Sequence, residues 1–287
     1  MPLIFILIAL GFDFFLGNLE RYRNYDWIIS LYHFLEKRLA LYKYWDGSLG
    51  LLGLLAIPVL VLLLIVAALD HWSSIAEGIF VLLVLIYCLA PESLDNRLDQ
   101  YITAIDEDDE DSVSSLTEKL VDVDLTSDED LNETAIIKSV FVEAHKRSFA
   151  VIFWFLILGV VGALLYRLVN ELNEEMSDVR SGYSDSTNVL LNILEWPSSR
   201  IMIIGLGLAG SLVHAFTGWQ QSEKASFDVN SQVLSDAGIG ALQYIPDMEV
   251  PGREKSYWIG EVKSLINRTL IICLAVLAIM TLSGNLG

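Results

Sequence analysis

The sequence predicts an all-α, polytopic membrane protein with five to six membrane segments, together with amphipathic and cytoplasmic helices. Of its 287 residues 54% are hydrophobic, and the mean hydropathy is +0.50, which is too apolar for an ordinary soluble domain. Long uncharged runs recur along the chain, and helices of such length enter or cross a bilayer. Fifteen of the eighteen Lys and Arg residues lie in three alternate connecting segments, as the positive-inside rule predicts. We expect one membrane domain over residues 1–287.

The first predicted segment, residues 2–19, is short and contains Asp13. It has neither a basic n-region nor a small-residue cleavage site, so we expect a retained helix and not a signal peptide. Two interpretations stay open, a span and a segment that only enters the membrane. Residues 17–48 place apolar residues at helical spacing among five basic ones. This pattern predicts an amphipathic helix, which lies on the membrane surface or packs against other cytoplasmic segments.

Residues 49–69 and 75–90 form the clearest pair of spans. The first carries no charge and contains Pro58, which removes one backbone hydrogen bond and kinks the helix. A short turn, 70–74, leads into the second, which Pro91 ends.

The polar insert 91–148 holds 17 of the 37 acidic residues of a chain whose net charge is −19. So negative a protein is not expected to bind nucleic acid. We interpret its acidic runs, such as 106–112, as solvated loops, since a calcium loop needs a turn glycine that the insert lacks. The cysteines, Cys88 and Cys273, have no metal-ligand spacing, and we predict no metal and no cofactor.

The run 149–168 follows a charged cluster at 143–147, whose basic residues keep the insert in the cytoplasm. Gly159 and Gly162 interrupt this run. A re-entrant pair of half-helices is therefore an alternative to a single span, provided that protein or a water-filled cavity shields the break.

The last predicted segments are 201–218 and 269–285, separated by a second cytoplasmic segment, 219–268. The run 201–218 is rich in glycine, which lets helices approach closely, either within the chain or in a homodimer. We expect its His214 to be a hydrogen-bonded residue at the interface. Strict alternation of the six segments places both termini outside.

Three features in this order resemble the AmpE family: RSFAVIFWF at 147–155, LEWPSSR at 194–200 and the C-terminal span. The resemblance covers nearly the whole chain. It implies a multi-pass protein of the bacterial inner membrane that is paired with the AmpD amidase and linked to β-lactamase regulation and cell-wall recycling.

A more distant similarity is to the CobD/CbiB membrane enzymes, which attach an aminopropanol arm to the corrin ring in cobalamin synthesis. Residues 13–17 resemble their D-x-x-x-G-D-P signature, with Asn-Leu in place of Asp-Pro, and 258–260 resembles their W-I-G element. LLNILEWPSSR at 190–200 resembles their D-D-V-x-N-Y-x-P-A-R element, with Arg200 retained and both acids absent. Their E-N-x-x-D element has no match, because 142–146 reads Val-Glu-Ala-His-Lys.

From these resemblances we expect a non-catalytic regulatory protein of the AmpE kind, which binds a small anionic or cell-wall-derived ligand, or a protein partner, at its cytoplasmic face. The alternative is a CobD/CbiB-like enzyme that forms an amide between a phosphate-bearing amino alcohol and a corrinoid carboxylate, with Asp13, Glu143 and Glu195 as metal or acid–base groups. The candidate ligand-binding residues, whose basic members would pair with an anion, are Glu143, His145, Arg147, Glu195, Trp196, Arg200, Trp258 and Asp13. A plainer interpretation is that the cluster at 143–147 only anchors its helix at the interface.

Overall fold

The computed structural model describes residues 2–15, 24–39, 45–89, 94–120, 133–176, 181–222, 230–245 and 256–283. All regular secondary structure within these ranges is helical, so the all-α class is confirmed. The chain divides into two compact units. Unit 1 consists of Met1–Pro91 and Ala150–Glu195, and unit 2 consists of Glu92–Phe149 and Trp196–Gly287.

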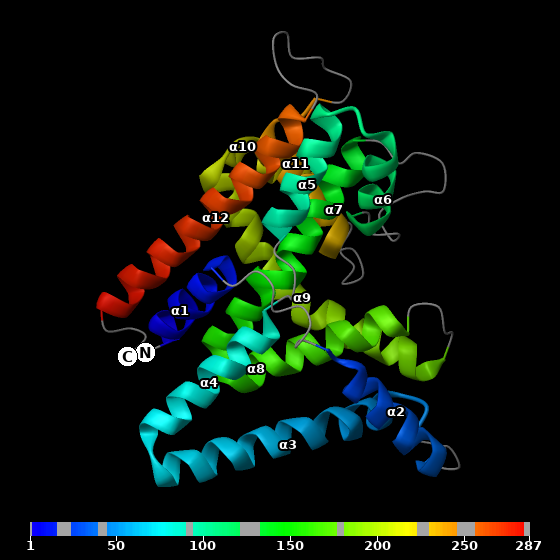
Figure 1. Cartoon of the computed structure of the whole chain (residues 1–287), viewed down its shortest axis with the longest axis vertical. Coiled ribbons are helices and arrows are strands. Elements are labelled where there is room, and N and C mark those ends of the chain that lie inside the picture. The colour runs from blue at the N-terminus through cyan, green and yellow to red at the C-terminus, as the bar shows by residue number, and fades with distance from the viewer. Residues whose placement is uncertain are drawn as a thin grey trace. The chain divides into compact units, whose positions relative to one another are not determined.

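Unit 1 is built on a long helical hairpin. Its helices are α1 (Pro2–Phe15), α2 (Asp26–Leu39), α3 (Ser48–Trp72), α4 (Ser74–Cys88), α8 (Ala150–Glu175) and the first part of α9 (Gly182–Ala209). Extended backbone at Ser73 joins α3 to α4, a turn that is visible in Figure 1. Leu54 on the protein-facing side of α3 is buried, whereas Leu60 and Leu64 are more than half exposed, as on a helix that faces lipid.

The helix α8 is broken at Gly159, which has φ 64° and ψ −153°. A Cβ atom added to Gly162 would lie 2.3 Å from the carbonyl oxygen of Trp154. In a continuous helix, residues eight apart are about 12 Å apart along the axis, so the chain bends sharply between them. The two half-helices that the glycines allow are therefore what the chain forms.

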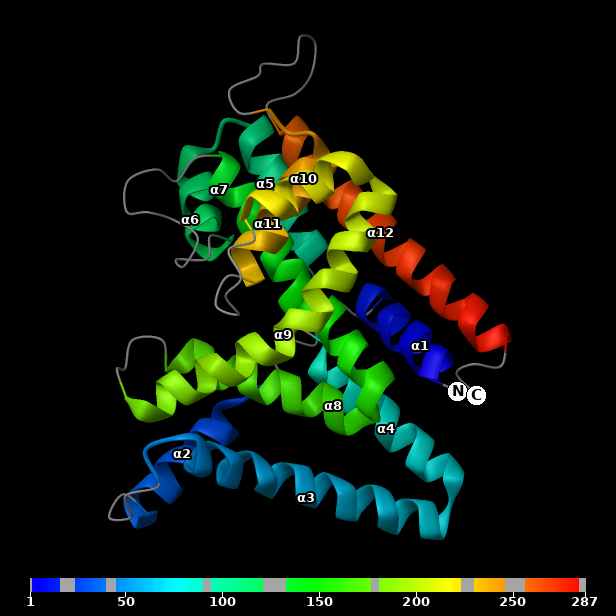
Figure 2. The same cartoon turned by 180° about the vertical axis from the view of Figure 1, so that it is seen from behind.

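Unit 2 contains α5 (Leu94–Asp106), α6 (Glu110–Leu120), α7 (Glu133–Ala144), a π-helical turn (His145–Phe149), the end of α9, α10 (Leu212–Ser222), α11 (Asn230–Leu242) and α12 (Tyr257–Leu282). Figure 2 shows α10 and α11 side by side. The buried core joins residues from all these helices, among them Leu98, Leu120, Phe141, Met202, Ala215, Val233 and Ile259. The acidic insert is thus part of a folded unit.

Close packing of α10 on α11 depends on two glycines. A Cβ atom at Gly218 would lie 2.4 Å from the oxygen of Asp236, and one at Gly240 would lie 2.2 Å from the oxygen of His214. The amide of Ser211 also donates to the oxygen of Ala241, at 3.0 Å. This part of the glycine-rich surface is therefore used for packing inside the chain.

Three predicted segments differ from the structure. The acidic run 106–112 is a loop only over residues 107–109, because Asp106 ends α5 and Glu110 begins α6. The run 201–218 is two helices, since α9 ends at Ala209 and α10 begins at Leu212. The last helix begins at Tyr257, twelve residues before the predicted start, because its charged first turns pack within unit 2.

Four helices of the described chain are long and apolar enough to cross a membrane: Ser48–Trp72, Glu133–Glu175, Gly182–Ala209 and Tyr257–Leu282. Two shorter apolar helices, Pro2–Phe12 and Ser74–Cys88, complete the set. His214 is exposed at the start of α10, where its Nδ1 lies 2.7 Å from the Oγ of Ser211. The expectation of a hydrogen-bonded histidine is confirmed.

Candidate functional site

Buried polar side chains gather in unit 2 where the π-helical turn meets the end of α9 and the start of α11. We call this set the polar cluster; its members are His145, Trp196, Ser198, Ser199, Arg200 and Asn230. All except Trp196 are at least nine-tenths buried. Buried polar groups are costly unless they are hydrogen-bonded, so their arrangement here is strongly constrained.

His145 opens the π-helical turn that follows α7. It is 2% exposed, and its Nε2 lies 2.8 Å from the Oγ of Ser198. The charges of Lys146 and Arg200 both act on the imidazole. Single π-helical turns inside α-helices are rare among helices in general, but those that occur are frequently at functional sites.

Arg200 binds two partners from different helices. Its Nη1 donates to the Oγ of Ser199, at 3.0 Å, and to the Oδ1 of Asn230 at the start of α11. Its guanidinium lies 5.4 Å from the ring centroid of Trp196, within the range of a cation–π contact. Trp196 is 44% exposed, so the cluster reaches the surface of the unit beside this ring.

Glu143 and Arg147 form an ion pair one helical turn apart, at the edge of the π-helical turn. Their side chains are 20% and 17% exposed. Such a pair stabilises the junction of α7 and the π-helical turn.

Glu195 belongs to unit 1. It is 4% exposed and accepts a hydrogen bond of 3.3 Å from the hydroxyl of Tyr166. Trp258 lies on α12 in unit 2, where its ring packs edge-on against Tyr244 and beside Tyr257, each at 5.1 Å between centroids. Asp13 is in α1, and its side chain lies outside the described residues. Of the eight predicted residues, the structure thus brings together His145, Trp196 and Arg200.

Sequence reasoning missed Ser198, Ser199 and Asn230. The two serines lie inside the element LEWPSSR, which was singled out for its arginine. Asn230 lies thirty residues from Arg200 and belongs to no motif, so only the fold identifies it.

The polar cluster does not fit a magnesium ion. Mg²⁺ prefers carboxylate oxygens, whereas the cluster offers an imidazole, hydroxyls, an amide and a guanidinium. Glu143, two residues before His145, is held by Arg147. Within the described ranges there is no group of three or more His, Cys, Asp or Glu side chains that could hold a metal ion. We therefore derive no metal-dependent step from the cluster.

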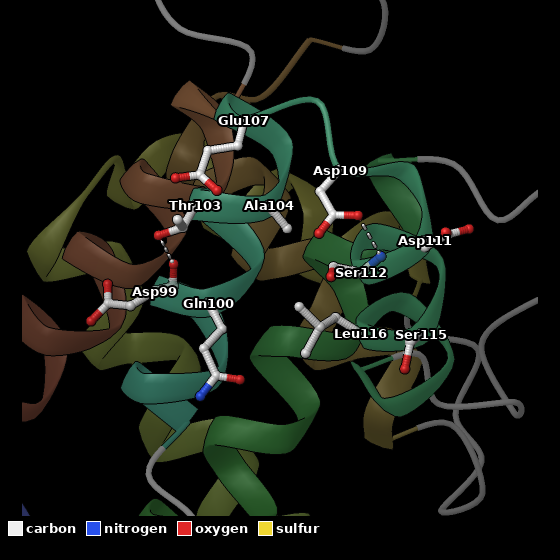
Figure 3. Close-up of a pocket in the computed structure, with 10 residues that line it drawn as sticks. All are labelled: Asp99, Gln100, Thr103, Ala104, Glu107, Asp109, Asp111, Ser112, Ser115 and Leu116. Carbon is white, nitrogen blue, oxygen red and sulfur yellow. Dashed lines mark hydrogen bonds between the residues drawn. The ribbon is translucent and has the colours of Figure 1, made fainter.

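A hollow of unit 2 lies between α5 and α6 and has a volume of about 680 Å³ (Figure 3). Asp99, Glu107, Asp109 and Asp111 are among its lining residues, and Figure 3 shows them spread around its rim. Asp99 pairs with Lys263 at 2.5 Å, and Asp109 accepts from the amide of Ser112 at 3.2 Å. Asp99 thus links α5 to α12, whereas the contact of Asp109 is local to the start of α6.

Comparison with known proteins supplies the family. The family model described as CobD/Cbib protein matches residues 6–244. The cobalamin biosynthesis protein CobD of Chromobacterium violaceum is 29% identical over 116 residues, which are 38% of this chain and 36% of that relative. The chain thus aligns with little more than a third of that relative's length. No solved structure matches the chain.

These matches contradict the predicted function. A non-catalytic regulator of the AmpE kind, linked to β-lactamase regulation, is wrong, because the family that matches is described by CobD and CbiB. The elements at 13–17 and 190–200, which resemble those of the CobD/CbiB enzymes, both lie within the matched range. This resemblance therefore indicated the family correctly. Since the match covers more than half of its length, the chain belongs to the CobD/CbiB family.

Proposed function

We propose that the chain is a bacterial inner-membrane protein of corrinoid metabolism, which joins a phosphate-bearing amino alcohol to a corrinoid carboxylate through an amide. The family match over residues 6–244 supports the reaction class. One observation carries the assignment of the site: Arg200, retained in the family-like element, is buried in the polar cluster and held by Asn230 and Ser199.

Arg200 is suited to bind the anionic part of a substrate. A guanidinium presents donors in a planar fork that matches a phosphate or carboxylate, and burial strengthens such hydrogen bonds. The exposed ring of Trp196 covers the guanidinium and provides a flat apolar face for a ligand. The substrate class therefore contains an anion next to a flat or apolar body.

His145 is suited to act as a neutral hydrogen-bonding group toward the substrate, because burial and the charges of Lys146 and Arg200 oppose protonation of its imidazole. Amide formation requires an uncharged amine, so the ammonium of the amino alcohol must lose a proton before its nitrogen bonds to the carboxyl carbon. Ser198, at 2.8 Å, fixes the orientation of the imidazole. Condensation of an amine with a carboxylate removes the elements of water. A nucleoside triphosphate as co-reactant therefore first converts the carboxylate into a mixed anhydride with phosphate, and the amine nitrogen then displaces this phosphate, which leaves with one carboxylate oxygen.

The test uses the full chain in detergent, a corrinoid with a free carboxylate, an amino alcohol phosphate, and a nucleoside triphosphate with Mg²⁺. Mass spectrometry should detect the amide, which has the mass of the two substrates less one water. Arg200→Lys should abolish the product, because an ammonium cannot reproduce the planar fork. Arg268→Lys is the matched control, since Arg268 is half exposed and pairs with Glu261 at 3.7 Å.

Corrinoid binding is followed separately through the visible absorbance of the macrocycle. If the wild-type chain binds the corrinoid and yields no amide, the catalytic part of the proposal is wrong. If it neither binds nor reacts, the whole proposal is wrong.

A further inference from the structure

Unit 1 contains a pocket of about 470 Å³ at the point where α8 is broken. Residues of α1, α3, α4 and α8 line it, and α1, α4 and α8 contact one another, as can be followed in Figures 1 and 2. Most of the lining is apolar, including Phe5, Val66, Val81 and Phe155. Pockets of 300–1,000 Å³ with apolar walls and few polar groups are typical of small-molecule sites.

Glu77 is the carboxylate in this lining. It lies in the first turn of α4 and is half-buried. Its carboxylate makes no hydrogen bond or ion pair with any described residue. An ionisable side chain within an apolar membrane helix is costly unless it has a partner, so Glu77 is a candidate for binding a ligand.

The broken helix adds partial negative charge. Phe155, Leu156 and Leu158 belong to the turn before Gly159 and line the pocket. The carboxyl end of a half-helix carries partial negative charge. Gly159 itself leaves open space, since a Cβ atom added there would meet nothing within 4 Å.

Both features favour a ligand that donates hydrogen bonds and carries positive charge. A carboxylate is an acceptor and attracts a cation, and so does the partial negative charge at the end of a half-helix. The apolar walls require that the cation be attached to hydrocarbon. An ammonium with N–H bonds fits better than a trimethylated nitrogen, which has none to donate.

The position of the pocket beside the α3–α4 turn indicates where the ligand comes from. Val66 and Ser74 lie on either side of the α3–α4 turn, and Trp72 within this turn is 85% exposed. Exposed tryptophans at the ends of membrane helices mark the level of the lipid headgroups. The mouth is therefore accessible to a lipid from the surrounding leaflet.

We propose that this pocket binds the primary ammonium headgroup of a membrane phospholipid, with Glu77 as its counter-ion and hydrogen-bond acceptor beside the break at Gly159. This site is separate from the polar cluster of unit 2 and goes beyond the proposed amide-forming function. It predicts a preference among bilayer lipids that does not depend on corrinoid binding.

The test is native mass spectrometry of the full chain in mild detergent, titrated with phosphatidylethanolamine or with phosphatidylcholine of the same acyl chains. Wild-type protein should bind the ethanolamine lipid about ten-fold more tightly, as expected for a charge-assisted hydrogen bond. Glu77→Gln should remove this preference. Glu261→Gln, which changes a carboxylate of α12 paired with Arg268, should keep it.

Four results decide the proposal. Equal binding of the two lipids by the wild-type chain would overturn it, and so would a preference that survives in Glu77→Gln. Equal affinity for soluble ethanolamine phosphate would show that the apolar walls do not contribute, and would also overturn it. Val81→Trp, which fills the pocket while keeping Glu77, should weaken binding of the ethanolamine lipid.

Discussion

A buried histidine and a buried arginine in one polar cluster need several partners, and most of these are small residues. Ser198 orients His145, whereas Ser199 and Asn230 hold Arg200. Removing one partner leaves a buried polar group unsatisfied, which costs more than the hydrogen bond contributed.

Ser198→Ala should therefore lower the free energy of unfolding by about 1–3 kcal/mol, the cost of leaving a buried donor or acceptor without a partner. Ser235→Ala is the matched control. Ser235 is as deeply buried, but its hydroxyl donates to the carbonyl of Gln232 within the same helix, so little is lost with it. Chemical unfolding in detergent measures both. Equal effects of the two substitutions would show that the His145–Ser198 contact does not stabilise the fold.

At this scale the sequence predicted the charged and aromatic members of the cluster and missed the small ones. His145 and Arg200 stand out because such residues are rare beside apolar runs. Serine and asparagine occur throughout the connecting segments, so nothing in the chain marks Asn230 as a partner of Arg200. Glu195 was grouped with Arg200 because the two lie close in sequence. In the structure Glu195 and the Tyr166 hydroxyl that donates to it belong to unit 1, whereas Arg200 belongs to unit 2.

Among the elements, helix positions were easier to predict than helix ends. The run 49–69 carries no charge, and α3 extends only a few residues beyond it. The start of α12 was missed because its charged residues, Glu261, Lys263 and Arg268, are typical of a loop. In the structure Lys263 pairs with Asp99 of α5. Tertiary contacts of this kind leave no local signal.

The break in α8 gives a test at the level of one element. Gly162→Ala should destabilise the protein by about 1–3 kcal/mol, because its Cβ would lie 2.3 Å from the backbone oxygen of Trp154, which cannot move aside easily. Gly53→Ala is the control, since a Cβ there meets nothing within 4 Å inside α3. It should stabilise by about 0.5–1 kcal/mol. Thermal unfolding in one detergent compares the two, and a neutral Gly162→Ala would argue against the bend.

The start of α6 should depend on pH. Asp109 precedes this helix, and hydrogen bonds from Ser112 hold the pKa of its carboxyl below the usual value. A lowered pKa means that the ionised cap stabilises the helix at neutral pH and that this contribution is lost as the pH falls through the pKa of the folded state. Hydrogen exchange of peptides from 110–120 should show weaker protection in Asp109→Ala at neutral pH. Because the pKa of the folded state lies below the ordinary 3.8 of an aspartate, the difference from wild type should shrink as the pH falls below that ordinary value. A constant difference would exclude a charge effect.

For the whole molecule, the charge pattern and unit 2 lead to the same topology. Lys263 lies 2.5 Å from Asp99, and Asn267 lies 3.4 Å from Asp95, so the insert and the segment before the last apolar stretch belong to one side of the membrane. Both hold basic residues, as does the segment 17–48. The positive-inside rule predicts that all three are cytoplasmic and that the α3–α4 turn, which has no Lys or Arg, lies on the opposite side.

Single-cysteine labelling tests this arrangement once Cys88 and Cys273 are replaced by alanine. Glu107→Cys and Gln221→Cys place exposed thiols in two of the basic segments, and His71→Cys places one in the α3–α4 turn. Glu36→Cys places a partly exposed thiol in the third basic segment, since the side chain of Glu36 is 43% exposed. A maleimide that cannot cross membranes should modify the thiols of the three basic segments only in inside-out vesicles and the thiol of the α3–α4 turn only in intact spheroplasts. The thiol of Glu36→Cys is decisive, because unit 2 already ties the other two segments together. If it reacts from the side opposite to Gln221→Cys, the positive-inside assignment fails, and α1, α3 and α4 must cross the membrane in another order.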